Sequence, residues 1–167
     1  KRLEMENFKS FKVEVVVPYE RGFTAITGPN GSGKSNCGDA IQFVLGYKSA
    51  KDVRASNVLD LLFNGGKNNK PAKYCKVTLV FDNPEDPDGS RRLKIDADEV
   101  HFTRAVRKTR SGSASSNYYL NGESSSQRQF KLLLSSANAR ADGYNIVLQG
   151  MVTELATMTG SNRRKVL

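Results

Sequence analysis

The sequence predicts a mixed α/β fold in which a strand-rich lobe packs beside a helix that begins at a glycine-rich loop. Three observations lead to this prediction. Segments of alternating apolar or β-branched residues recur along the chain, apolar residues after position 35 have helical spacing, and the loop joins a predicted strand to that helix. The chain has 167 residues, 38% of them hydrophobic and 26% charged, so one domain with a buried core is expected.

The first half of the chain is predicted to contain three strands and two helices. Its elements, in order, are two short strands within Leu3–Val17, a buried strand at Phe23–Thr27, a helix at Ser35–Leu45 and a short helix at Val58–Leu62. The longer helix has one apolar face, formed by Cys37, Ile41, Val44 and Leu45. Gly46 ends this helix. We expect Ile26 of the third strand and Ile41 of the helix to lie in the core.

The second half of the chain adds further strands and a second long helix. The expected elements are a strand at Lys76–Phe81, an acidic turn at Asp82–Gly89, a strand pair at His101–Val106 and Asn117–Leu120, a helix at Gln127–Ser135 and a strand at Tyr144–Leu148. The segment Ser111–Ser116 joins the strand pair, and Asn121-Gly122 predicts a tight turn after it.

Composition excludes several classes of protein. The sequence has no apolar run of about 18 residues, the length of a membrane-spanning helix, and no apolar stretch of a signal peptide at its start, so we expect a cytoplasmic protein without membrane contact. Two cysteines and one histidine are too few for a disulfide framework or a metal cluster. The net charge of +9 and a pI near 9.7 predict an anionic partner, for which DNA is the obvious candidate.

The glycine-rich loop reads Gly28-Pro29-Asn30-Gly31-Ser32-Gly33-Lys34-Ser35 and fits the P-loop pattern G-x-x-x-x-G-K-[ST] in full. Its glycines allow backbone N–H groups to point inward at phosphate oxygens, and the start of the following helix adds positive potential. Lys34 is expected to reach the β- and γ-phosphates, the Ser35 hydroxyl to bind Mg²⁺, and Asn36 to add a phosphate contact. By itself the motif predicts nucleotide-phosphate binding, as in small-molecule kinases, GTPases, helicases and ABC ATPases alike.

Longer stretches around this loop resemble the N-terminal head segment of the SMC (structural maintenance of chromosomes) family, in a prokaryotic, archaeal-like form. The matching stretches, in chain order, are Leu3–Phe11, Thr27–Gly46, Val53–Ser56, Leu61–Gly65, Tyr118–Gly122, Asn145–Gly150 and Met158–Arg164. They span nearly the whole chain in the family's order, which is far more specific than the P-loop alone.

The resemblance implies an ABC-ATPase-type head, with residues 1–167 as its N-terminal part: a mixed or antiparallel sheet beside the P-loop helix. In this family the head is split, so the coiled coil, the hinge and the C-terminal half with the Walker B acids would be absent here. Two heads of a homodimer would enclose two ATP molecules, and hydrolysis would drive DNA-associated cycling in chromosome condensation and segregation. A kleisin subunit would bridge the heads, DNA contact would be independent of base sequence, and the protein would be associated with the nucleoid.

The resemblance also implies roles for residues outside the P-loop. Gln149 would bind Mg²⁺ or position the attacking water. Lys9 and Ser10 would line the nucleotide, and Arg54 would act near the γ-phosphate as an arginine finger or a DNA-sensing residue. The predicted catalytic residues are Lys34, Gln149 and Arg54, and the predicted metal ligands are Ser35 and Gln149.

Two further features of the sequence bear on this interpretation. Met151 stands where the family usually has an acidic residue, which puts in doubt any contact made by that carboxylate. Basic residues that could form a phosphate-tracking patch for DNA, or a solvated basic loop, are Arg91, Arg92, Lys94, Arg104, Arg107, Lys108 and Arg110.

Alternative interpretations remain open from the sequence. One is the head of another DNA-repair ABC ATPase, of the double-strand-break repair or RecF/RecN-like kind. A small-molecule kinase would need an acceptor pocket and a basic lid, and a nucleic-acid-binding module without enzymatic activity leaves the P-loop unexplained. We also expect this chain alone to bind nucleotide weakly and not to hydrolyse it, because Glu154, its only acidic residue after Gln149, lacks the setting of a Walker B acid.

Overall fold

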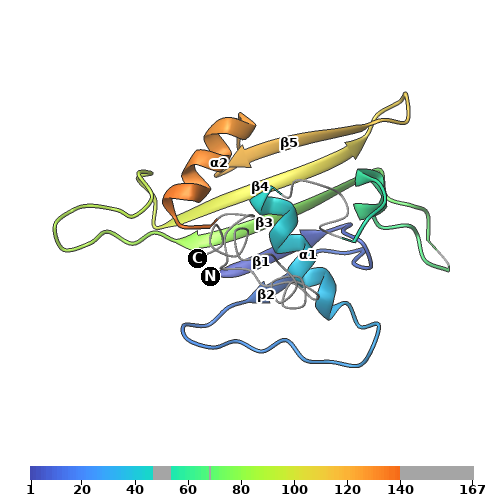
Figure 1. Ribbon diagram of the computed structural model, residues 1–167, viewed down its shortest axis with the longest axis horizontal. Helices are drawn as coiled ribbons and strands as arrows, with labels where there is room; N and C mark the ends of the chain where they lie inside the picture. The colour runs from blue at the N-terminus through green and yellow to red at the C-terminus, as the bar shows by residue number, and fades with distance from the viewer. Residues whose placement is uncertain (47–53, 68, 140–167) are drawn as a thin grey trace, which may run out of the picture.

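The computed structural model describes residues 1–46, 54–67 and 69–139. Their main feature is a six-stranded sheet in the order β2-β1-β3-β4-β5-β6, in which all neighbouring strands are antiparallel (Figure 1). The elements along the chain are β1 (Arg2–Glu6), β2 (Val15–Pro18), α1 (Lys34–Leu45), the 3-10 helix η2 (Val58–Leu61), β3 (Tyr74–Asp82), β4 (Glu99–Lys108), β5 (Ala114–Leu120), β6 (Glu123–Ser125) and α2 (Gln127–Ser136).

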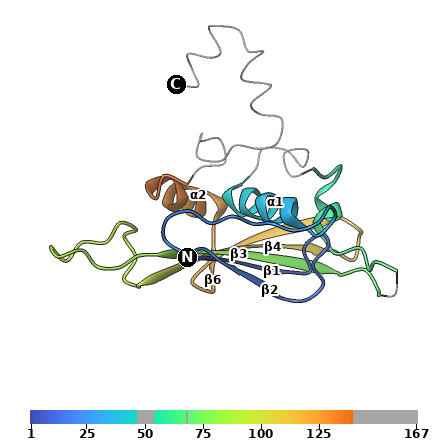
Figure 2. The same ribbon diagram turned by 90° about the horizontal axis from the view of Figure 1, so that it is seen from below.

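Both α-helices lie on the same face of the sheet, and the core is the layer between them and the strands (Figure 2). Alternate residues of the strands point into this layer, as Leu3 and Met5 do in β1. The helices contribute the fully buried side chains of Phe43 and Phe130. Neither α-helix in the described part of the chain is long and apolar enough to cross a membrane.

Most of the predicted elements are present, with boundaries shifted by a few residues. The two strands expected within Leu3–Val17 are β1 and β2, the two predicted helices are α1 and α2, and the predicted central strands are β3, β4 and β5. The short helix at 58–62 is present as η2, where the Asp60 carboxylate accepts a 2.7 Å hydrogen bond from the Asn57 N–H. The predicted strand at Tyr144–Leu148 lies outside the described residues.

The prediction of a buried strand at Phe23–Thr27 is wrong. Residues 23–28 have no regular secondary structure, Phe23 is 92% exposed, and Ile26, which was expected in the core, is 41% exposed. A strand needs a neighbour for its backbone hydrogen bonds, and no strand in the described ranges pairs with this segment. The chain instead leaves β2 as an open loop that returns to α1 (Figure 1). Ile41 meets its prediction in part, since it is partly buried against the core.

Candidate phosphate-binding site

The P-loop leads directly into α1, and its glycines are required by its geometry. Gly31 and Gly33 have φ angles of 82° and 94°, in the left-handed region that favours glycine. A Cβ atom added to Gly33 would lie 2.9 Å from Cζ of Phe11, and one added to Gly28 would lie 2.8 Å from Oγ of Ser32. Gly33 is also the N-cap of α1, so the N–H groups of the first turn are not covered by a capping side chain. The loop thus presents backbone donors at a helix start, where an anion is stabilised.

Lys34 is the first residue of α1, and its side chain turns back along the loop. Its Nζ donates hydrogen bonds of 2.6 Å to the carbonyl oxygens of both Gly28 and Pro29, in an exposed position that a ligand can reach. Ser35, in the same turn, is exposed and carries a hydroxyl oxygen of the kind that Mg²⁺ accepts as a ligand. A cation, a glycine-lined loop and a helix N-terminus together form a donor set for phosphate. The residues present therefore fit the phosphates of ATP.

The turn that follows β1 lies against the start of α1. The Asn36 side chain donates a 2.8 Å hydrogen bond to Oγ of Ser10, and this Oγ would lie 3.3 Å from a Cβ atom at Gly33. On its other side the turn is held by η2, because the Lys9 N–H donates a 2.8 Å hydrogen bond to the carbonyl oxygen of Leu61. The structure thus brings the predicted residues Ser10 and Asn36 together beside the P-loop.

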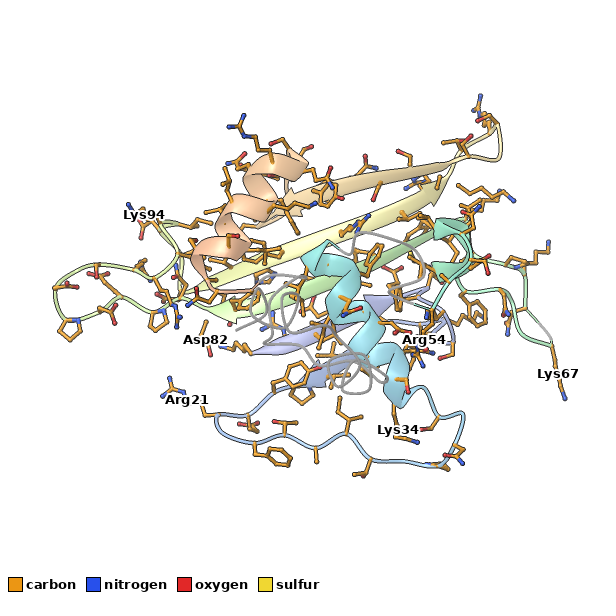
Figure 3. All side chains as sticks on the ribbon, in the orientation of Figure 1. Arg21, Lys34, Arg54, Lys67, Asp82 and Lys94 are labelled. Carbon is orange, nitrogen blue, oxygen red and sulfur yellow. The ribbon has the colours of Figure 1, made fainter. Side chains whose placement is uncertain are left out.

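Lys9 and Arg54, both predicted to act near the phosphates, converge on a buried carboxylate of α1. Asp39 is 3% exposed, and its Oδ2 accepts a hydrogen bond of 2.5 Å from Lys9 Nζ and one of 2.6 Å from Arg54 Nη2. Its Oδ1 accepts a third, of 3.1 Å, from Arg54 Nε. Figure 3 shows Arg54 beside α1 and Lys34 at the start of the same helix. Asp39 was not among the predicted site residues, because it does not lie on the apolar face expected for this helix and its burial depends on how α1 packs.

Two positions discussed from the sequence fall outside the described residues. Gln149, the predicted ligand of Mg²⁺ or of the attacking water, lies there, and so does Met151. The described part of the site therefore consists of the P-loop, the first half of α1, the turn after β1 and Arg54.

The basic residues considered as one DNA patch do not form a single surface. Arg104 is 7% exposed, and its Nη1 donates a 2.8 Å hydrogen bond to the carbonyl oxygen of Phe43. Arg91 and Lys94 precede β4, whereas Arg110 lies in the turn after it, so the two groups are at opposite ends of that strand (Figure 1). Sequence order suggested a cluster because the two groups are close in the chain, but an extended strand of ten residues separates them in space.

Comparison with known proteins identifies the family. The sequence matches the family described as the RecF/RecN/SMC N-terminal domain over residues 1–142. The chain belongs to this family. The similar proteins compared below are SMC proteins, which favours the SMC interpretation over a small-molecule kinase or a RecF/RecN-like repair head.

The SMC relatives match nearly the whole chain. The chromosome partition protein Smc of Pyrococcus furiosus is 46% identical over 99% of this chain, which corresponds to 13% of the length of that protein. A solved SMC ATPase, from work on ATP-driven dimerization and DNA-stimulated activation, has a TM-score of 0.87 at 46% identity. The match covers 99% of this chain and 95% of that chain. The Smc head domain of Pyrococcus furiosus with an extended coiled coil, bound to the C-terminal domain of ScpA, has a TM-score of 0.84 at 46% identity, with 99% of this chain and 39% of that one covered. The fold is thus that of the N-terminal lobe of an SMC head.

Proposed function

We propose that this chain is the ATP-binding N-terminal part of an SMC ATPase head, and that its parent protein acts in chromosome condensation and segregation through ATP-dependent head engagement. The observation that carries the proposal is the P-loop at the start of α1, with Lys34 lying across it. The turn after β1 and Arg54 border the same helix, so the predicted contacts come from three separate segments of the chain.

In this proposal the residues of the site hold the triphosphate and Mg²⁺. The P-loop N–H groups and Lys34 bind the phosphate oxygens, Asn36 and Ser10 line the site beside them, and Ser35 contributes a metal ligand. Mg²⁺, when bound, neutralises charge that develops on the phosphates. Gln149 remains the proposed second metal ligand or water-positioning residue.

The proposed partners follow from the relatives and from the exposed surface. Solved SMC relatives include heads bound to ScpA and an ATPase described as dimerizing on ATP, and we propose a kleisin subunit and a second copy of the head as partners here. DNA, bound without base specificity and giving the protein its place on the nucleoid, is consistent with the net charge of +9. We further propose that the C-terminal half of the same head covers the loop that carries Phe23 and Ile26, because both side chains are exposed.

Replacing Lys34 tests the proposal. Lys34→Ala in the full-length parent protein removes the fixed cation of the P-loop, so ATP affinity or turnover should fall about 100-fold or more. Steady-state ATPase and nucleotide-binding measurements would show this loss. Lys94→Ala is the matched control, because Lys94 is an exposed lysine in the loop before β4, away from Lys34 (Figure 3). Unchanged binding and turnover in Lys34→Ala would show that the loop does not hold the nucleotide.

A further inference from the structure

We propose that Asp39 is a positioning residue, which holds the guanidinium of Arg54 beside the phosphate-binding loop in the orientation that the ATPase reaction requires. The inference rests on the proposed function, since it assigns a role within the same site. It concerns a buried charged group that the P-loop motif does not include.

The contact between the two side chains fixes the plane of the guanidinium. Arg54 donates to both oxygens of the Asp39 carboxylate, through Nε at 3.1 Å and Nη2 at 2.6 Å. Such paired bonds define the orientation as well as the distance of an arginine. These two bonds use two of the five N–H donors of the guanidinium. The Arg54 side chain is 49% exposed, whereas that of Asp39 is 4% exposed. The carboxylate therefore holds one edge of the guanidinium, and the rest of it remains accessible to a ligand.

The location of Asp39 relates this contact to the P-loop. Asp39 follows Ser35 by four positions in α1, so the two residues lie on the same side of the helix, about 6 Å apart along its axis. A guanidinium held at Asp39 is thus about one helical turn from the residue proposed to bind Mg²⁺. That separation suits a cation that interacts with the distal part of a triphosphate.

The local charge and backbone geometry indicate that this arrangement has a function. Among the described residues, Asp39 pairs with Lys9 as well as with Arg54, so two cations contact one buried carboxylate. Both partners have positive φ angles, 48° for Lys9 and 50° for Arg54, a conformation that is unfavourable for residues other than glycine. Left-handed residues of this kind concentrate at functional sites, where the surrounding structure holds them.

A double-mutant cycle in the full-length parent protein tests the assignment. Asp39→Asn keeps the size of the side chain but removes its charge, and Arg54→Ala removes the group that it holds. Each should lower the kcat for Mg-ATP by about 10- to 100-fold, as loss of a supporting hydrogen-bond partner does at other sites. The double variant should be no slower than the slower single variant, because Asp39 acts through Arg54. The dissociation constant for ATP should change by less than about threefold in all three variants, since the P-loop supplies that affinity.

Glu6→Gln is the matched control for this cycle. Glu6 is a partly buried carboxylate that pairs with Lys76 and with the hydroxyl of Tyr74, and it has no part in the proposed site. This variant should keep the kcat of the unchanged protein. Unchanged turnover in Asp39→Asn, or losses that multiply in the double variant, would overturn the assignment.

A second measurement does not depend on how well Asp39→Asn folds. In a crystal structure of the ATP-bound parent protein, an Arg54 nitrogen should remain within about 3.2 Å of an Asp39 oxygen. Separation of the two side chains in that state would overturn the assignment. Failure of the proposed function is distinct, because it would appear as absent ATP turnover in the unchanged protein or as unaffected turnover in Lys34→Ala.

Discussion

Arg104 connects the last turn of α1 to β4. Its Nη1 donates to the Phe43 carbonyl at 2.8 Å, and its Nε donates to Oγ of Ser116 at 3.1 Å. The guanidinium carbon lies 4.6 Å from the centre of the Phe43 ring and 5.2 Å from that of Tyr118. A cation at this position satisfies a terminal carbonyl and complements the negative end of the helix dipole. Arg104 therefore holds the distal end of the helix whose other end carries the P-loop.

Cys75 should be unreactive in the folded protein. Burial raises the pKa of its thiol to about 12, and burial also raises the pKa of Cys37. Only the thiolate reacts, and at pH 8 a pKa near 12 leaves about one thiol in ten thousand ionised. Alkylation at pH 8, followed by mass spectrometry, should leave the Cys75 peptide unmodified until denaturant is added. Rapid modification of Cys75 in the folded protein would show that β3 is not packed as described.

The residues of the P-loop could be predicted because their chemistry depends on neighbours in the chain. Lys34 and Ser35 follow the glycines in a fixed pattern, and the geometry agrees with that pattern. The burial of Asp39 and Arg104 could not be predicted in this way, because it depends on which elements pack together. The sequence around Arg104 is typical of a surface cation, but in the fold its guanidinium packs against the rings of Phe43 and Tyr118.

The helix α2 packs on the core through two buried side chains, Phe130 and Leu134. Phe130 is fully buried, and its ring centre lies 5.3 Å from that of Phe102 and 5.1 Å from that of Tyr118, both edge-on. Phe130→Ala should lower the free energy of unfolding by about 3–5 kcal/mol, because it leaves a cavity under the helix. Leu132→Ala in the same helix should change it by less than about 0.5 kcal/mol, since Leu132 is 62% exposed. Denaturant titration of the two variants would check this, and equal losses would contradict the described packing of α2.

Strands that pair with a neighbour close in the sequence were predicted well. β4 alternates in burial along most of its length, and a short turn joins it to β5, so the pairing of the two strands is local. The segment 23–27 has the composition of a buried strand but takes no place in the described sheet. Composition indicates that this segment could form a strand. A strand also needs a neighbouring strand for its backbone hydrogen bonds, and the local sequence does not show whether one is present.

The whole chain contributes one part of a site that we propose to be composite. The P-loop, Arg54 and the turn after β1 supply cations and N–H donors, but phosphoryl transfer also needs acidic residues at the metal and a group that positions water. The edge strand β2 and the loop that leads from it to the P-loop carry exposed apolar side chains, which we call the apolar margin: Val16, Phe23 and Ile26. A second half of the head that covered this margin would complete both the core and the site.

The most direct test of this account is the Mg²⁺-dependent ATPase rate of the chain alone and after mixing with the C-terminal half of the parent head. We expect no turnover by the chain alone, turnover by the mixture, and loss of that turnover in a mixture that contains Lys34→Ala. Mg²⁺-dependent turnover by the chain alone, abolished by Lys34→Ala, would contradict the composite site and would favour a self-contained P-loop kinase or ATPase.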